Sequence, residues 1–255
     1  MSLINDLKKF SRLLADESGK IILRYYRSDL NVEFKADQSP VTIADKKAEE
    51  FMRSLIMKEF PDHGIIGEEF GEYNSGAEYK WVLDPIDGTK SFISGVPLFG
   101  TLIALLHYNE PILGIINHPA LNECLIGDNI TTELNNIKVM VRNCDDLPSA
   151  LMLASDHLMV EKYRTKSGFD ELLSKVKLYR TWGDCYGYSL LASGYADIMI
   201  DPIMSMWDIA ALIPVVKGAG GIITDYYGNN PLEANSIVAA NSILHGQIIS
   251  ILNKK

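Results

Sequence analysis

The chain has 255 residues, of which 47% are hydrophobic and 22% charged, as in ordinary folded domains and unlike disordered or fibrous chains. This length predicts one large domain or two closely packed halves. The 33 acidic residues outnumber the 24 basic ones, which gives a net charge of -9 and leaves no basic excess to neutralise a nucleic acid backbone. We therefore expect no nucleic acid partner.

The cysteines and the apolar stretches predict the compartment. Cys124, Cys144 and Cys185 are odd in number and form no Cys-x-x-Cys pair, which is typical of a reducing environment. The first 27 residues lack the continuous apolar core and cleavage site of a signal peptide. No charge-free apolar stretch reaches the roughly 18 residues that a membrane span requires. We expect a cytoplasmic protein with no membrane partner.

The first half of the chain predicts helices followed by an antiparallel sheet. Apolar residues at helical spacing predict a helix over residues 3–27. Thr42 is a suitable N-cap for a second helix that runs to about Phe60. Three strand regions follow at Ile65-Ile66, at 78–89, where the strand stops at a proline-containing turn, and at 97–128, a meander that turns at Asn109-Glu110-Pro111.

From about residue 150, strands alternate with helices, which predicts an α/β layer. The expected strands are 150–155, 177–180, 196–200 and 220–224, and the expected helices are 158–174, 184–194 and 206–217. No repeat or flexible linker divides the chain. We predict halves at 1–145 and 146–255 that share one interface in a compact unit, with the active site between them.

Three acidic segments stand out: Gly67-Glu68-Glu69, the run Asp-Pro-Ile-Asp-Gly-Thr at 84–89, and Trp207-Asp208. In the middle segment, Asp84 at the end of a strand and Asp87 three residues later could surround one or two hard cations, which prefer oxygen ligands. Gly88 and Thr89 open a helix or turn whose backbone N–H groups could hold a phosphate. One short segment could therefore bind both metal and anion.

Each segment also has a simpler interpretation. Asp, Pro and Gly are ordinary turn formers, so the middle segment could be a surface turn. The apolar strand at 81–83 and the apolar stretch after the run favour acids at the edge of a core instead. Glu68 and Glu69 could be a solvated pair, and Asp208 could complement a helix dipole.

Taken together and in this order, the Gly-Glu-Glu segment, the run at 84–89 and the late Trp-Asp before a helix ending at Gly220-Gly221 resemble the inositol monophosphatase family. The resemblance covers nearly the whole chain, from the loop at 39–42 onward. It implies a mixed α and β fold, a layered αβαβα sandwich, and hydrolysis of a small phosphate monoester by water. The family commonly forms homodimers.

The resemblance also implies a metal site. Glu68, Asp84, Asp87 and Asp208 would be side-chain ligands, and the backbone carbonyl of Ile86 a further ligand, of two to three Mg²⁺ ions. These ions would activate the attacking water and offset the charge of the transferring phosphoryl group. They would supply the positive field that an acidic chain lacks.

For catalysis, the resemblance makes Asp45 and Thr89 the pair that orients the water, with Glu68 as its base. On sequence alone, Asp45 would be interpreted as a solvated residue early in a helix. The backbone N–H groups of Gly88 and Thr89 would hold the phosphate.

Residues 180–188 carry the substrate prediction, because the family's members differ here in the alcohol they accept. Asp184 beside Cys185, with paired aromatic residues, is most similar to the histidinol-phosphate phosphatase branch. Its substrate carries a primary ammonium and an imidazole, with which Asp184 and Asp201 could pair, and Asp201 matches the position that contacts the leaving group. Asp184 could instead be an N-cap. Arg180 could pair across a subunit interface or hold a nearby acid, and Cys185 is interpreted as a packing residue.

Some alternatives stay open. The stretch between Glu68 and Asp84 is short, so we expect no structured lid there, whereas the loop with Lys35, Asp37, Gln38 and Ser39 could close over the metals. A related enzyme could act on inositol 1-phosphate, a sugar bisphosphate or a nucleotide 3′-phosphate. A non-catalytic regulatory member would have lost a metal carboxylate, and none is lost. A cation-binding structural protein would gain stability from Mg²⁺ without turnover.

Overall fold

The structure, a computed structural model, describes residues 3–28, 33–34 and 40–254. Its largest element is an eight-stranded sheet in the order β10-β9-β8-β7-β6-β5-β3-β4. The strands are β3 (Gly64–Gly67), β4 (Gly71–Tyr73), β5 (Tyr79–Asp87), β6 (Gly100–His107), β7 (Glu110–His118), β8 (Glu123–Gly127), β9 (Thr132–Leu134) and β10 (Ile137–Val139).

The pairing in this sheet is antiparallel except between β3 and β5, which are parallel. Strands β6 and β7 are joined by Tyr108 and Asn109, whose φ values of 47° and 67° suit a tight hairpin turn of the primed type. The turn therefore lies one residue earlier than the predicted Asn109-Glu110-Pro111. The expected loop between Glu68 and Asp84 contains the short strand β4, which pairs with β3.

A five-stranded mixed sheet follows, in the order β12-β11-β13-β15-β14. Its strands are β11 (Leu151–Ala154), β12 (Leu178–Arg180), β13 (Ile198–Asp201), β14 (Ile222–Thr224) and β15 (Ile237–Ala240). Strand β11 is parallel to both β12 and β13, whereas β15 is antiparallel to β13 and β14. The sequence predicted four of these strands and missed β15, which lies between β13 and β14.

The helices are α1 (Leu3–Leu23), α2 (Ile43–Glu59), α3 (Thr89–Ile93), α4 (Leu158–Tyr163), α5 (Lys166–Lys175), α6 (Asp184–Ala192), α7 (Met206–Ala210), α8 (Leu212–Gly218) and α9 (Ser242–Leu252). Short 3₁₀ turns lie at Leu147–Ser149 and Pro231–Glu233, and β1 (Glu33–Phe34) pairs with β2 (Pro40–Val41). Thr42 caps α2 as predicted, because its side chain accepts a hydrogen bond from the Ala44 amide.

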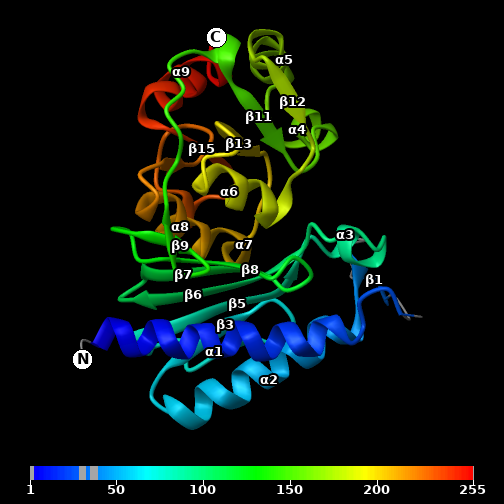
Figure 1. The fold of residues 1–255 in the computed structure, drawn as a ribbon, viewed down its shortest axis with the longest axis vertical. Helices are drawn as coiled ribbons and strands as arrows, with labels where there is room; N and C mark the ends of the chain where they lie inside the picture. Colours follow the sequence, from blue (N-terminus) through cyan, green and yellow to red (C-terminus); the bar gives the residue numbers. More distant parts are fainter. Residues whose placement is uncertain (1–2, 29–32, 35–39, 255) are drawn as a thin grey trace.

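The elements stack in five layers, which confirms the predicted αβαβα sandwich (Figure 1). Helices α1 and α2 cover one face of the eight-stranded sheet, α6, α7 and α8 lie between the two sheets, and α5 and α9 lie beyond the second sheet. Because β6 is covered on both faces, its residues are apolar without alternation. Leu102 belongs to the core between the sheets, and the next residue, Ile103, to the core under α1 and α2.

Several predicted helices end or break differently. The first helix ends at Leu23 rather than at residue 27. The helix expected at 158–174 is divided at Arg164, whose backbone is extended. The Arg164 guanidinium lies over the Tyr226 ring, and its Nη2 donates to Asn235 Oδ1 at 2.6 Å.

The helix expected at 206–217 is two helices that meet at Ala211. Pro214 explains the break, because it has no amide hydrogen to donate to the Ala210 carbonyl and its ring crowds that turn. The loop of residues 35–39 lies outside the described residues. Within the described residues, none of the helices combines the length and the apolar character needed to traverse a bilayer.

Candidate active site

The run at 84–89 forms the end of a strand and the start of a helix rather than a turn. Strand β5 continues to Asp87, and its register against β6 shifts between Asp84 and Asp87. Residues three apart on a regular strand face opposite sides of the sheet, and an irregularity of this kind can re-aim a side chain. The Thr101 hydroxyl donates to the Pro85 carbonyl at 2.9 Å and holds the distorted segment. Asp84 and Asp87 therefore serve one site.

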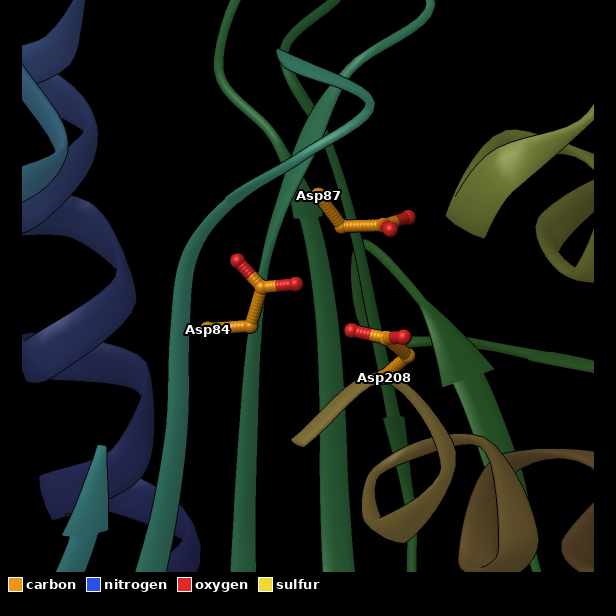
Figure 2. Close-up of side chains that lie close together, drawn as sticks. All are labelled: Asp84, Asp87 and Asp208. Atoms are coloured by element: carbon orange, nitrogen blue, oxygen red, sulfur yellow. The ribbon is translucent and has the colours of Figure 1, made fainter. Parts of the chain in front are cut away.

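Asp208 reaches the same site from α7. The Ser205 amide donates to Asp208 Oδ2 at 2.7 Å in a capping box, which fixes the carboxylate at the start of the helix. One carboxylate oxygen each of Asp84, Asp87 and Asp208 lie within 4.8 Å of one another, and Figure 2 shows the three side chains converging. Segments more than a hundred residues apart in the sequence thus meet in one acidic cluster.

The cluster is electrostatically unfavourable without a cation. Burial raises the pKa of Asp84 well above its usual value, and the charges of Glu68, Asp87 and Asp208 raise it further. Burial, with smaller effects from neighbouring charges, also raises the pKa of Asp208 to about 7. Asp84 Oδ1 is buried and has no hydrogen-bond partner among the described residues. Hard oxygen donors with an unsatisfied carboxylate oxygen fit a divalent cation.

Glu68 lies beside this cluster, at the end of β3. Its amide donates to the Leu83 carbonyl at 3.2 Å, which ties it to the neighbouring strand. The residues that follow it are held by the buried carboxylate of Glu49, which accepts from the amides of Glu69 and Phe70 at 2.8 and 3.1 Å. Glu49 was not identified from the sequence.

Ile86 and Thr89 lie next to each other. The Thr89 hydroxyl donates to the Ile86 carbonyl, the predicted ligand, at 3.0 Å. Gly88 has φ 80° and is the N-cap of α3, a conformation that favours glycine. The helix that follows is only five residues long.

Asp45 is buried in the second helix, so its interpretation as a solvated residue is wrong. Its carboxylate accepts from the amide and hydroxyl of Thr42 at 2.8 and 2.7 Å, and burial raises its pKa to about 6. Asp45 and Thr89 thus bond to different neighbours. The charges of Glu68 and Glu69 contribute to the pKa shift of Asp45, which places this carboxylate near the acidic segment.

Asp184, at the start of α6, lies against the run at 84–89. The N-cap of α6 is Gly183, so the interpretation of Asp184 as an N-cap is wrong. Asp184 Oδ2 lies 3.0 Å from the point that a Cβ on Gly88 would occupy. Burial and then the charge of Asp201 raise the pKa of Asp184 to about 6. Its backbone has φ 51°, a strained value for a residue other than glycine.

Cys185 is buried, and its amide donates to Asp87 Oδ2. Burial raises the pKa of its thiol, which suits a packing residue rather than a nucleophile. Asp201 is buried at the end of β13. Arg180 is exposed at the end of β12, where its guanidinium donates to the Tyr179 carbonyl at 2.7 Å and lies over the Trp182 ring.

The sequence also missed Ser155 and Tyr188, which contact the two predicted substrate acids. The Ser155 hydroxyl accepts from the Asp184 amide at 2.7 Å, and the Tyr188 hydroxyl donates to Asp201 Oδ2 at 2.8 Å. Tyr188 is four residues after Asp184 on one helix, a spacing that places both on the same face. That spacing is the signal that could have identified it.

Comparison with known proteins identifies the family. Residues 4–255 match the model of the inositol monophosphatase family. The chain is 40% identical over 242 residues to a histidinol-phosphatase of Chlorobaculum parvum, covering 94% of this chain and 93% of the relative. It is 47% identical over 234 residues to the bifunctional phosphatase IMPL2, chloroplastic, of Arabidopsis thaliana, covering 90% and 67%.

Among solved structures, an inositol monophosphatase from Zymomonas mobilis superimposes with a TM-score of 0.89 at 37% identity and covers 99% of each chain. Its similarity and the family match span both sheets and the acidic cluster. The chain therefore belongs to the inositol monophosphatase family and is a phosphoric monoester hydrolase.

Proposed function

We propose that this phosphatase hydrolyses histidinol phosphate with Mg²⁺ as its cofactor. The observation that carries the substrate proposal is the position of Asp184, which lies against Gly88 while its pKa responds to the charge of Asp201. Asp184 beside the proposed phosphate-binding segment, with the charge of Asp201 acting on it, suits a leaving alcohol with an ammonium group, because charge-assisted hydrogen bonds to a cation are strong. A neutral cyclitol would gain less from them.

The residues proposed to hold the metal are the carboxylates of Glu68, Asp84, Asp87 and Asp208 and the carbonyl of Ile86. When bound, two to three Mg²⁺ ions would supply positive charge that lowers the pKa of a water and offsets the charge of the phosphoryl group. The unsatisfied Asp84 oxygen and the raised pKa values of the cluster support this assignment.

The remaining roles belong to the chain's own polar groups. Glu68 would accept the proton of the attacking water, with Asp45 and Thr89 orienting that water. The backbone N–H groups of Gly88 and Thr89 would hold the phosphate oxygens. Asp184 and Asp201 would bind the ammonium or imidazole of the leaving group, with Cys185 and Arg180 in the surrounding wall.

The proposal includes a cytoplasmic homodimer. The three cysteines are all unpaired and buried, which agrees with a reducing compartment. The exposed side chains of Leu158, Leu178 and Trp182 lie in the part of the chain that we expect at a dimer interface. The oligomeric state is measurable by light scattering.

Phosphate release tests the proposal. L-histidinol phosphate, inositol 1-phosphate, fructose 1,6-bisphosphate and 3′-phosphoadenosine 5′-phosphate are compared in parallel, with Mg²⁺ and with a chelator. We expect turnover of histidinol phosphate to exceed that of the other esters and to vanish with the chelator and in Asp87→Asn. Preference for inositol 1-phosphate would contradict the substrate proposal, and turnover that survives the chelator would contradict the cofactor proposal.

A further inference from the structure

Asp201 is held by two donors from different elements. Its side chain is 3% exposed, its Oδ1 accepts from the Ser155 amide at 3.1 Å, and its Oδ2 accepts from the Tyr188 hydroxyl at 2.8 Å. The amide is at the end of β11 and the hydroxyl comes from α6. Two donors on separate oxygens determine the plane of the carboxylate. Burial raises the pKa of Asp201, and the hydrogen bonds from Ser155 and Tyr188 oppose this rise.

The same contacts relate Asp201 to Asp184. Ser155 donates to Asp201 with its amide and accepts from the Asp184 amide with its hydroxyl. Tyr188 is on the helix that begins with Asp184, and its hydroxyl reaches Asp201. The two acids are therefore held at a fixed separation by a short network of Ser155 and Tyr188. Neither connecting residue belongs to the acidic cluster of Asp84, Asp87 and Asp208.

The Tyr188 hydroxyl has few contacts other than its hydrogen bond to Asp201. Its side chain is fully buried, and besides Asp201 its hydroxyl contacts only the Met204 sulfur, at 3.5 Å, among the described residues. A thioether is a weak acceptor, so the carboxylate determines where the hydroxyl hydrogen points. The orientation of Asp201 and the rotamer of Tyr188 thus depend on each other.

A second buried tyrosine near Asp201 provides a matched comparison. Tyr226 is 4% exposed, and its pKa is raised by burial and then by the charge of Asp201. In contrast to Tyr188, its hydroxyl has no hydrogen-bond partner among the described residues. Removing the Tyr226 hydroxyl changes the same region without removing a contact to Asp201.

We propose that Tyr188 is a positioning residue for substrate selection, which holds Asp201 so that Asp201 and Asp184 together bind the ammonium group of the leaving alcohol. This inference rests on the proposed function, since it requires a cationic leaving group. It assigns Tyr188 no contact with the phosphate or the metal.

The test compares Tyr188→Phe with Tyr226→Phe on L-histidinol phosphate and on inositol 1-phosphate in Mg²⁺. Tyr188→Phe removes a hydrogen bond to a carboxylate. We therefore expect its KM for histidinol phosphate to rise about tenfold, while kcat changes less than about twofold. The kinetic constants for inositol 1-phosphate stay the same. Tyr226→Phe leaves the kinetic constants for both substrates unchanged. Equal losses on both substrates, or in both variants, would overturn the role of Tyr188.

A double-mutant cycle with Asp201→Asn separates this role from a structural one. If Tyr188 acts through Asp201, the double variant has the same KM for histidinol phosphate as Asp201→Asn alone. Additive effects of the two substitutions on KM would overturn the inference. If Tyr188→Phe fails to fold, Asp201→Asn alone is the test, and an unchanged KM for histidinol phosphate in that variant would overturn the inference. A wild-type enzyme that releases phosphate from inositol 1-phosphate but not from histidinol phosphate would instead refute the proposed substrate, and with it the ammonium role.

Discussion

The carboxylate of Glu49 occupies the space that a side chain on Gly67 would need. A Cβ on Gly67 would overlap the Glu49 carboxylate, whose oxygens accept from the amides of Glu69 and Phe70 and pair with Arg53 at 3.1 Å. Glu49 is fully buried. The glycine of the Gly-Glu-Glu segment therefore leaves room for a buried acid that holds the backbone directly after the predicted ligand Glu68.

Gly67→Ala is expected to destabilise the fold and impair catalysis. The new methyl group must displace the Glu49 carboxylate, and overpacking of this kind costs about 1–3 kcal/mol. The melting temperature and the rate of phosphate release in Mg²⁺ should both fall, because the displaced Glu49 carboxylate no longer holds the backbone next to Glu68. Gly76→Ala is the control, since a Cβ there meets no heavy atom within 4 Å in the described part of the chain. Equal melting temperatures for the two variants would contradict this account.

The ion pair of Arg142 with Asp197 is expected to be important for stability. Arg142 Nε donates to Asp197 Oδ1 at 2.6 Å, Nη2 donates to the other oxygen, and the Leu151 amide adds a third donor at 2.7 Å. The Asp197 side chain is fully buried. Arg142→Met leaves this buried carboxylate without its charged partner. We expect the free energy of unfolding, measured in urea, to fall by about 3 kcal/mol.

An exposed pair provides the control for that prediction. Lys166 and Glu161 are 3.1 Å apart with side chains 54% and 71% exposed. Glu161→Gln should leave the free energy of unfolding nearly unchanged, because solvent screens such exposed pairs. A loss as large as that of Arg142→Met would show that burial does not determine the difference.

His118 is expected to make stability depend on pH. Its ring is fully buried between the Phe99 carbonyl and the Ser189 hydroxyl, and burial lowers its pKa from 6.5 to about 4. Between these values the unfolded chain binds a proton that the folded chain does not, so the stabilisation is complete above about pH 6.5 and is lost as pH falls. At about 1.4 kcal/mol per pH unit, the loss is about 3 kcal/mol by pH 4.

His118→Gln isolates this contribution. The free energies of unfolding of the wild type and the variant are measured in urea with a chelator, from about pH 7.5 to pH 4.5. Their difference should shrink with falling pH, because only the wild type has a histidine that gains a proton on unfolding. A difference that stays constant would mean that His118 does not titrate over this range.

Asp208→Asn tests the repulsion in the acidic cluster. Burial raises the pKa of Asp208 to about 7, so removing its charge should raise the melting temperature in a chelator by a few degrees. Added Mg²⁺ should stabilise the wild type and have a smaller effect on the variant. Asp170→Asn, on the exposed face of α5, should behave as the wild type. A lower melting temperature of Asp208→Asn in the chelator would contradict the repulsion.

The sequence predicted what depends on local signals. The Thr42 cap, the apolar strand before Asp84 and the helix that begins at Asp184 follow from neighbouring residues. The break at Ala211 was overlooked, although Pro214 is a local signal for it.

Contacts between segments far apart in the chain could not be predicted from the sequence. The position of β15 between β13 and β14 depends on sheet register, and the hydrogen bond from Tyr188 to Asp201 depends on how α6 packs against β13. The Asp208 carboxylate was grouped with Asp84 and Asp87 through family resemblance, since nothing in their spacing relates them. Local sequence signals determine helices and strands better than they determine the packing that joins them.

The most direct test of the proposed function is the ratio of kcat/KM for L-histidinol phosphate to that for inositol 1-phosphate, in wild type and in Asp184→Asn. We predict that the wild type prefers histidinol phosphate and that Asp184→Asn lowers the ratio about tenfold, since an ammonium loses a charged partner, while kcat/KM for inositol 1-phosphate stays within about twofold. A wild-type preference for inositol 1-phosphate, or an equal loss on both substrates, would contradict recognition of a cationic leaving group by Asp184.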